Sequence, residues 1–358
     1  MSDARSENLS ENTSDDTGET SYKNTGDNTG DHTNKSASNN TSDNISDNQS
    51  PIIDFAHSRK TQLQKHDHLV RGVAADGMIR AIAMSGRETV EAAHANHNTS
   101  PVVSAALGRT MMAAQMMAAM FKSPDELLTL QIKGDGPIRA ITVTANNLGH
   151  VKGFAAYPNV WLPLNDKGKL DVGTGIGKGT LTVIRDLPGT TPYSSQTELV
   201  SGEIGDDLAA YFTLSDQTPT SVGVGVLVNP DTTIRQAGGF IVQLMPDYEP
   251  YIVDDLEKKL ESIRSVTQML EDGMTPHDIL QHILGEFEYK ELEVSPAAFH
   301  CGCNKERASR ATLALGSDVI RDMISQGETA EVHCHFCGKD HRLSPAELQE
   351  LLDSSERL

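Results

Sequence analysis

Four cysteines are the residues of this 358-residue chain whose types and spacing most clearly indicate chemistry. Cys301 and Cys303 form a Cys-x-Cys pair, and Cys334 and Cys337 form a Cys-x-x-Cys pair thirty residues later. Four thiolates match structural Zn²⁺, whose Cys₄ sites are closed and tetrahedral. Gly338 follows the second pair and can adopt the backbone angles that a tight metal-binding turn needs. We therefore expect one Zn²⁺ ion bound by all four cysteines.

Other interpretations of these residues remain open. His333, His335 and His341 lie close to the second pair and are able to replace a thiolate, but four sulfurs already complete the shell, so we expect them to be spectators. Each close pair can also form a disulfide if its geometry allows. Disulfide sulfurs no longer ligate as thiolates, so oxidation would cost about 10–16 kcal/mol of metal binding. A whole domain has a stability of only about 5–15 kcal/mol, so oxidation should unfold a small zinc-bound segment.

The composition divides the chain into four parts and predicts an α+β fold. Residues 1–53 form an acidic tail of Ser, Thr, Asn, Asp and Gly, which should be disordered because it has little apolar surface to bury. Residues 54–245 mix helices and strands in irregular order, as in an α+β core domain. Residues 246–299 are predicted to be a helical linker, and residues 300–358, with every cysteine, a small zinc-binding domain.

Within the core, apolar periodicity and turn residues predict the main elements. Thr99–Phe121 should be a long helix rich in Ala and Met, whose methionines we expect to be buried. Ser123-Pro-Asp-Glu126 has the pattern of a capping box and predicts another helix. Val70–Met84 reads as a strand, and Leu128–Ile132 with Ile138–Thr144 as a hairpin.

The linker and the C-terminal part have helical patterns of their own. A helix is expected from Ile252 to Leu270 and a second from Thr275, each with a narrow apolar stripe and many acidic residues. Such helices are marginal in water and need a docking surface. Beyond them we expect helices over Lys305–Leu315 and Asp318–Gln326, a hairpin around the second cysteine pair, and a terminal helix opened by Ser344.

The charge limits the classes of partner. The formal net charge is −20, which opposes binding to nucleic acids and to anionic membranes. The first residues lack the apolar region of a secretory signal, and no apolar run is long enough to span a bilayer. These features predict a cytoplasmic protein.

From about Asp54 to Leu358 the chain resembles the redox-regulated heat-shock chaperones known as the 33 kDa chaperonin, or heat shock protein 33, family. The most specific element is the Cys-x-Cys and Cys-x-x-Cys pattern at this separation, behind a charged helical stretch. Further support comes from three stretches: Ser201-Gly-Glu-Ile-Gly-Asp-Asp-Leu208, Tyr211-Phe212 with Ser215-Asp216-Gln217, and Gly238-Gly-Phe-Ile-Val-Gln-Leu-Met-Pro246. The acidic tail is not part of the family pattern.

The resemblance implies an ATP-independent holdase and not an enzyme. Reduced cysteines would hold zinc in an inactive protein. Oxidants would form disulfides Cys301–Cys303 and Cys334–Cys337 with zinc release, and the linker would unfold. The oxidised protein, for which the resemblance also implies a homodimer, would bind unfolding clients under oxidative stress. The alternatives are a zinc-containing thiol-disulfide oxidoreductase, which would want its Cys-x-x-Cys near a βαβ unit, and a zinc-ribbon nucleic-acid module, which the acidic C-terminal part disfavours.

Overall fold

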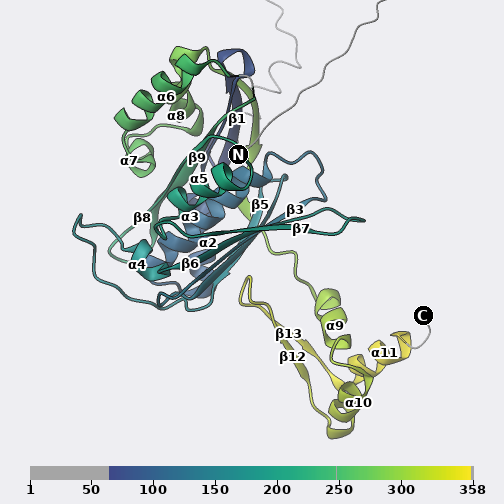
Figure 1. Cartoon of the computed structure of the whole chain (residues 1–358). Helices are drawn as coiled ribbons and strands as arrows, with labels where there is room; N and C mark the ends of the chain where they lie inside the picture. The colour runs from purple at the N-terminus through teal and green to yellow at the C-terminus, as the bar shows by residue number, and fades with distance from the viewer. Residues whose placement is uncertain (1–63, 247, 356–358) are drawn as a thin grey trace, which may run out of the picture. The chain divides into compact units, whose positions relative to one another are not determined.

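The computed structural model describes residues 64–246 and 248–355. The tail predicted to be disordered therefore lies outside the described residues. All described elements belong to one compact unit, Ser50–Leu358. They form two larger sheets and a two-stranded hairpin together with helices, so the predicted α+β class is confirmed (Figure 1).

The first sheet, here called sheet A, has the strand order β10-β1-β2-β9-β8 with antiparallel pairing throughout. Its strands are β1 (His68–Ala74), β2 (Ile79–Ser85), β8 (Thr220–Val228), β9 (Ile234–Leu244) and β10 (Lys290–Pro296). The run Val70–Met84, expected as one strand, is two strands joined by a short 3₁₀ turn, η1 (Ala75–Gly77). Ala75 and Asp76 have positive φ there and reverse the chain, an uncommon conformation that apolar periodicity does not signal.

The second sheet, sheet B, has the order β11-β5-β4-β3-β6-β7 and is antiparallel except where β11 pairs with β5. Its strands are β3 (Leu127–Gly134), β4 (Ala140–Asn146), β5 (His150–Ala155), β6 (Gly179–Asp186), β7 (Tyr193–Glu198) and β11 (Ala298–Phe299). The expected hairpin is the β3–β4 pair. The helix predicted from Ser123 is wrong: a turn leads directly into β3, because β3 pairs with β4 and β6 and alternate side chains of β3 are buried on the face of the sheet.

One long helix joins the two sheets into a core. Helix α3 (Pro101–Ala118) is the predicted Ala/Met helix and packs against strands of both sheets. Met111, Met112 and Met116 have no exposed surface, so they are core residues, as expected. The remaining helices of this part are α2 (Arg87–His97), α4 (Val172–Ile176) and α5 (Ile204–Leu214).

The linker helices, as we call α6 (Pro250–Ser262), α7 (Val266–Glu271) and α8 (Pro276–Leu284), lie on the other face of sheet A (Figure 1). The single helix expected from Ile252 to Leu270 is interrupted at Ile263, whose ψ of 150° is extended. After α8 and a 3₁₀ turn, η2 (Gly285–Phe287), the chain is not helical: β10 pairs with the edge of β1. Pairing with the distant strand β1 therefore makes the end of this segment a strand, although its dense charge had suggested a helix.

The C-terminal segment, residues 300–355, follows the expected order of elements. It contains α9 (Lys305–Leu313), α10 (Ser317–Gln326), the hairpin β12 (Ala330–His333) and β13 (Asp340–Leu343), and α11 (Pro345–Ser355). Ser344 and Glu347 exchange the hydrogen bonds of a capping box at the start of α11. Its buried core is small and consists of Ile320, Ala330, Leu343, Leu348 and Leu352.

Candidate metal centre

The first cysteine pair lies in a short extended segment between a strand and a helix. Strand β11 pairs with β5, and the His300 N–H donates to the Val151 carbonyl at 2.8 Å, which anchors the chain just before Cys301. The Asn304 side chain accepts from the Arg307 N–H at 2.8 Å and caps α9, so the helix begins directly after Cys303. Both cysteines are thus held between two anchored elements.

The second pair forms the turn of the β12–β13 hairpin. The Cys334 carbonyl accepts from the N–H groups of Cys337 at 3.2 Å and Gly338 at 2.8 Å. Gly338 has a φ of +69°, and a Cβ there would lie 2.9 Å from the Asn96 carbonyl oxygen. Only glycine meets both demands, which confirms the expected role of this residue.

The four sulfurs converge, although the two pairs are separated by two helices and a strand. All lie within 4.8 Å of one another, and Cys337 is buried while the other three are partly exposed. Cys301 Sγ is 3.7 Å from Cys334 Sγ, and Cys303 Sγ is 3.4 Å from Cys337 Sγ. A Zn–S bond of about 2.3 Å in a tetrahedral site places sulfurs about 3.8 Å apart. This group, which we call the cysteine cluster, therefore has the size of a four-sulfur metal site.

The protonation of the cysteine cluster also fits a cation. Burial and hydrogen bonding to Cys337 raise the pKa of Cys303 to about 12. Burial likewise raises the pKa of Cys301. At Cys334 burial acts in the same direction, but hydrogen bonds from the Phe336 N–H and from neighbouring thiols outweigh it and lower the pKa to about 7. Thiolates this close together repel one another, and a coordinated divalent metal provides the charge that compensates them.

The neighbouring histidines take different positions. His341 Nε2 lies 3.4 Å from Cys303 Sγ, within hydrogen-bonding reach of a ligand sulfur. His333 Nδ1 pairs with Asp340 at 2.7 Å, and the His335 ring lies 5.7 Å from the Phe154 ring. Among the described residues, only the four cysteines gather as a group able to hold a metal ion. His341 therefore lies next to the candidate site. The position of the three histidines in the sequence did not show that His341, and not His333 or His335, would lie there.

The cysteine turn touches the core, a contact that sequence reasoning missed. His97 Nε2, at the end of α2, lies 3.0 Å from the Phe336 carbonyl oxygen. The Phe336 ring meets the Phe154 ring edge-on at 5.3 Å, and Lys152 Nζ lies 4.5 Å from its centroid. Phe336 stands between two cluster cysteines in the sequence, so this contact connects the cluster directly to β5 and α2. No sequence signal pairs these residues, because the contact joins segments more than 180 positions apart.

Comparison with known proteins assigns the chain to a family. The family model described as Hsp33 protein matches residues 67–344. The chain belongs to the Hsp33 family. A 33 kDa chaperonin of Agathobacter rectalis is 49% identical over 80% of this chain and 99% of its own length. The 33 kDa chaperonin of Bacillus pumilus is 46% identical over 81% of this chain and 100% of its own length.

A solved structure agrees with this assignment. The crystal structure of the 33 kDa chaperonin, a heat shock protein 33 homologue, from Thermotoga maritima superposes with a TM-score of 0.75 at 37% identity and covers 82% of this chain and 100% of that one. The Hsp33 assignment places this chain among chaperones, and its cysteine cluster is compatible with zinc. No helix in the described ranges is long and apolar enough to cross a membrane.

Proposed function

We propose that this Hsp33 family member is an ATP-independent holdase switched by the oxidation of its cysteine cluster. The carrying observation is that two cysteine pairs distant in sequence meet at the spacing of one tetrahedral metal site. In the reduced protein, Zn²⁺ on Cys301, Cys303, Cys334 and Cys337 would clamp the C-terminal segment in its folded form. The Cys-x-x-Cys pair lies in an antiparallel hairpin and not near a βαβ unit, which favours this role over that of a thiol oxidoreductase.

Oxidation acts on this clamp through the sulfurs. The two thiolates that form each disulfide, which we propose to lie within each pair, give two electrons to an oxidant such as peroxide and no longer act as metal ligands. The apolar cluster of the C-terminal segment has only five buried residues, so little else stabilises the segment. Loss of about 10–16 kcal/mol of metal binding should therefore unfold it.

The linker helices supply the second part of the mechanism. Together with sheet A they form an apolar core separate from the one around α3. The sheet contributes Val70, Ala74, Ile79, Ala81, Ala83, Phe240, Val242 and Leu244, and the helices contribute Ile252, Leu256, Val266, Met269, Leu270, Ile279, Leu280, Ile283 and Leu284. Release of the helices would uncover a contiguous apolar face on three neighbouring strands. A surface of this kind binds exposed apolar segments of other proteins, and we propose unfolding client proteins as its partners.

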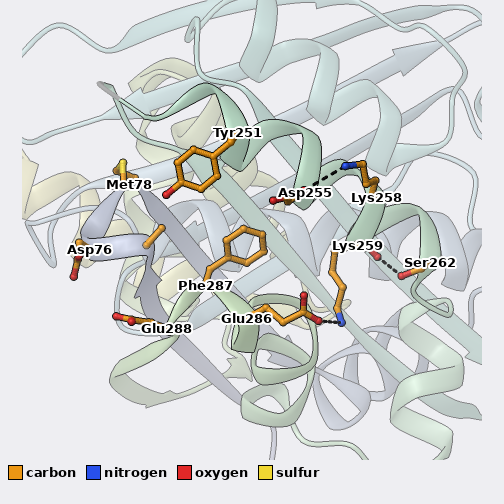
Figure 2. A pocket seen from close by; sticks show the side chains of 11 residues that line it. Asp76, Met78, Tyr251, Asp255, Lys258, Lys259, Ser262, Glu286, Phe287 and Glu288 are labelled. Carbon is orange, nitrogen blue, oxygen red and sulfur yellow. Dashed lines mark hydrogen bonds and ion pairs between the residues drawn. The ribbon is translucent and has the colours of Figure 1, made fainter.

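The docking of the linker helices is weak at α6. Of its thirteen residues only Ile252 and Leu256 are buried. An open pocket of about 770 Å³ separates part of α6 from η1 and η2, and Tyr251 and Phe287 extend into it (Figure 2). The ion pairs that bridge this region, such as Lys259–Glu286, are partly exposed, and such pairs contribute little stability. The linker is therefore suited to melt when its remaining support is lost.

Two connections can transmit unfolding from the cysteine cluster to the linker. The chain passes from α8 through β10, paired with β1, and β11, paired with β5, to Cys301. Phe336 contacts β5 and α2 from the other cysteine pair. Loss of the fold around the cluster would remove both supports at the end of the linker.

We further propose a cytoplasmic location, and an acidic surface with no role in nucleic-acid or membrane binding. A homodimer of the oxidised form is part of the same proposal.

The experiment is suppression of client aggregation by the full chain, with and without peroxide and without nucleotide. The oxidised protein should suppress light scattering from a chemically unfolded client on dilution, and the reduced, zinc-loaded protein should not. A matched control is the oxidised protein after reduction with dithiothreitol and addition of zinc, which should return to the inactive state. Equal suppression in both redox states, or a requirement for ATP, would refute the proposed switch.

A further inference from the structure

Arg80 forms no ion pair with a carboxylate of the described residues. It lies on β2 directly opposite Gln243 of β9. Its Nε and Nη2 donate to Gln243 Oε1 at 3.2 and 2.7 Å, and Gln243 Nε2 donates to Thr220 at 3.0 Å. The partner of this half-buried guanidinium is therefore a neutral amide, which does not offset the cost of burying a charge.

The neighbouring arginines differ from Arg80. Arg71 on β1 pairs with Glu293 and donates to the Ala119 carbonyl. Arg185 on β6 pairs with Glu126 at 2.6 Å and lies over the Phe121 ring. Burial, together with the nearby charge of Arg71, lowers the pKa of Arg80. An anion next to Arg80 would favour its charged form and so oppose both effects.

A cavity of about 190 Å³ opens beside the Arg80 guanidinium, between sheets A and B at the end of α3. Its polar lining includes Arg80, Gln243, Arg185 and Asp216, and its apolar walls include Met117 and Phe212, which are 6% and 3% exposed. This space far exceeds the roughly 10–15 Å³ that one water needs. Asp216 accepts a hydrogen bond from the Tyr211 hydroxyl at 3.2 Å, so its hydrogen-bond partner is Tyr211 and not Arg80.

We propose that this cavity binds a carboxylate carried on a short apolar group, with the carboxylate on Arg80 and the apolar group against Met117 and Phe212. Because Nε and Nη2 already donate to Gln243 Oε1, the terminal Nη1–Nη2 edge is the part of the guanidinium that can meet a carboxylate through two parallel hydrogen bonds. Buried thioether and aromatic walls favour an aliphatic substituent over a second charged group. Small organic acids and the C-terminus of a peptide ending in an aliphatic residue share this chemistry. Binding is independent of the cysteine cluster and occurs in the reduced protein.

The test is calorimetric titration of the reduced full chain with 4-methylpentanoate and with its neutral amide. The acid should bind and the amide should not. A second arm uses N-acetyl-Ala-Leu with a free or an amidated C-terminus: binding of the free form identifies peptide C-termini as ligands, and binding of 4-methylpentanoate alone identifies small free acids. Arg80→Gln should weaken acid binding at least about tenfold, equivalent to about 1.4 kcal/mol.

Two further variants keep the result interpretable. Arg235→Gln removes an equal charge from β9 at an ion pair with Glu271, outside the cavity, and should leave acid binding unchanged. Arg80→Lys keeps the charge but loses the fork, so it should bind the acid more weakly than the original chain even if Arg80→Gln does not fold. Equal binding of acid and amide, equal losses in Arg80→Gln and Arg235→Gln, or no heat of binding at ~10 mM acid, ten times a Kd of 1 mM, would overturn the proposal.

Discussion

Ile283→Ala tests whether undocking of the linker is sufficient for activity while the cysteines stay reduced. Ile283 has no exposed surface and lies in the core that α8 forms with β1 and β2. Truncation of a buried isoleucine to alanine costs about 2–5 kcal/mol. If the loss falls on the docking of α8, the equilibrium for local opening shifts by roughly 30- to 4,000-fold. The reduced, zinc-loaded variant should then suppress client aggregation in part.

Hydrogen exchange measures this opening directly. Amides of α8 should exchange faster by up to the same factor, while those of the β3–β4 hairpin should keep their protection. Ile283→Val, at about 0.5–1.5 kcal/mol, should accelerate exchange only roughly 2- to 12-fold and give correspondingly less activity. His282→Ala changes an exposed position on the same helix and is the matched control. If α8 exchanges rapidly in Ile283→Ala but the reduced protein stays inactive, the sheet face beneath the linker is not the client-binding surface.

Four further outcomes are expected. Metal analysis should find one zinc per reduced chain, and Cys334→Ser with Cys337→Ser should abolish tight binding; a second tightly held zinc, or full affinity in the double variant, would contradict the four-sulfur site. Peptide mapping of the peroxide-treated protein should find disulfides within each pair; because Cys301 Sγ also lies 3.7 Å from Cys334 Sγ and Cys303 Sγ 3.4 Å from Cys337 Sγ, crossed disulfides would show that the cluster oxidises without rearranging. Phe336→Ala should speed activation by peroxide by weakening the contact with β5, whereas Phe336→Tyr, which keeps the ring, should not; equal rates would remove this contact from the switch. Deletion of residues 1–50 should leave oxidised activity unchanged, and a large loss would give the tail a role.

Much of the fold could be predicted where local pattern and tertiary environment agree. The helix α3, the β3–β4 hairpin and the elements of the C-terminal segment follow from apolar spacing, turn residues and caps that lie within a few positions of each other. The prediction failed at Ser123, where a capping-box pattern precedes a strand, and at Lys290–Pro296, where a charged run pairs with β1. In both places hydrogen bonds to strands distant in the sequence outweigh local propensity.

The candidate metal centre likewise has features that follow from the local sequence and features that depend on tertiary packing. The sequence alone identified the four cysteines that we propose as its ligands, because thiolates at two- and three-residue spacing are chemically specific and need no knowledge of the rest of the chain. It also indicated that the linker requires a docking surface, since an amphipathic stripe is a local property. Only the tertiary structure decided which surface that is, that Phe336 joins the cysteine turn to β5, and that Arg80 faces a cavity without a carboxylate partner. These features depend on contacts between residues tens to hundreds of positions apart, and such contacts exist only after the whole chain has packed.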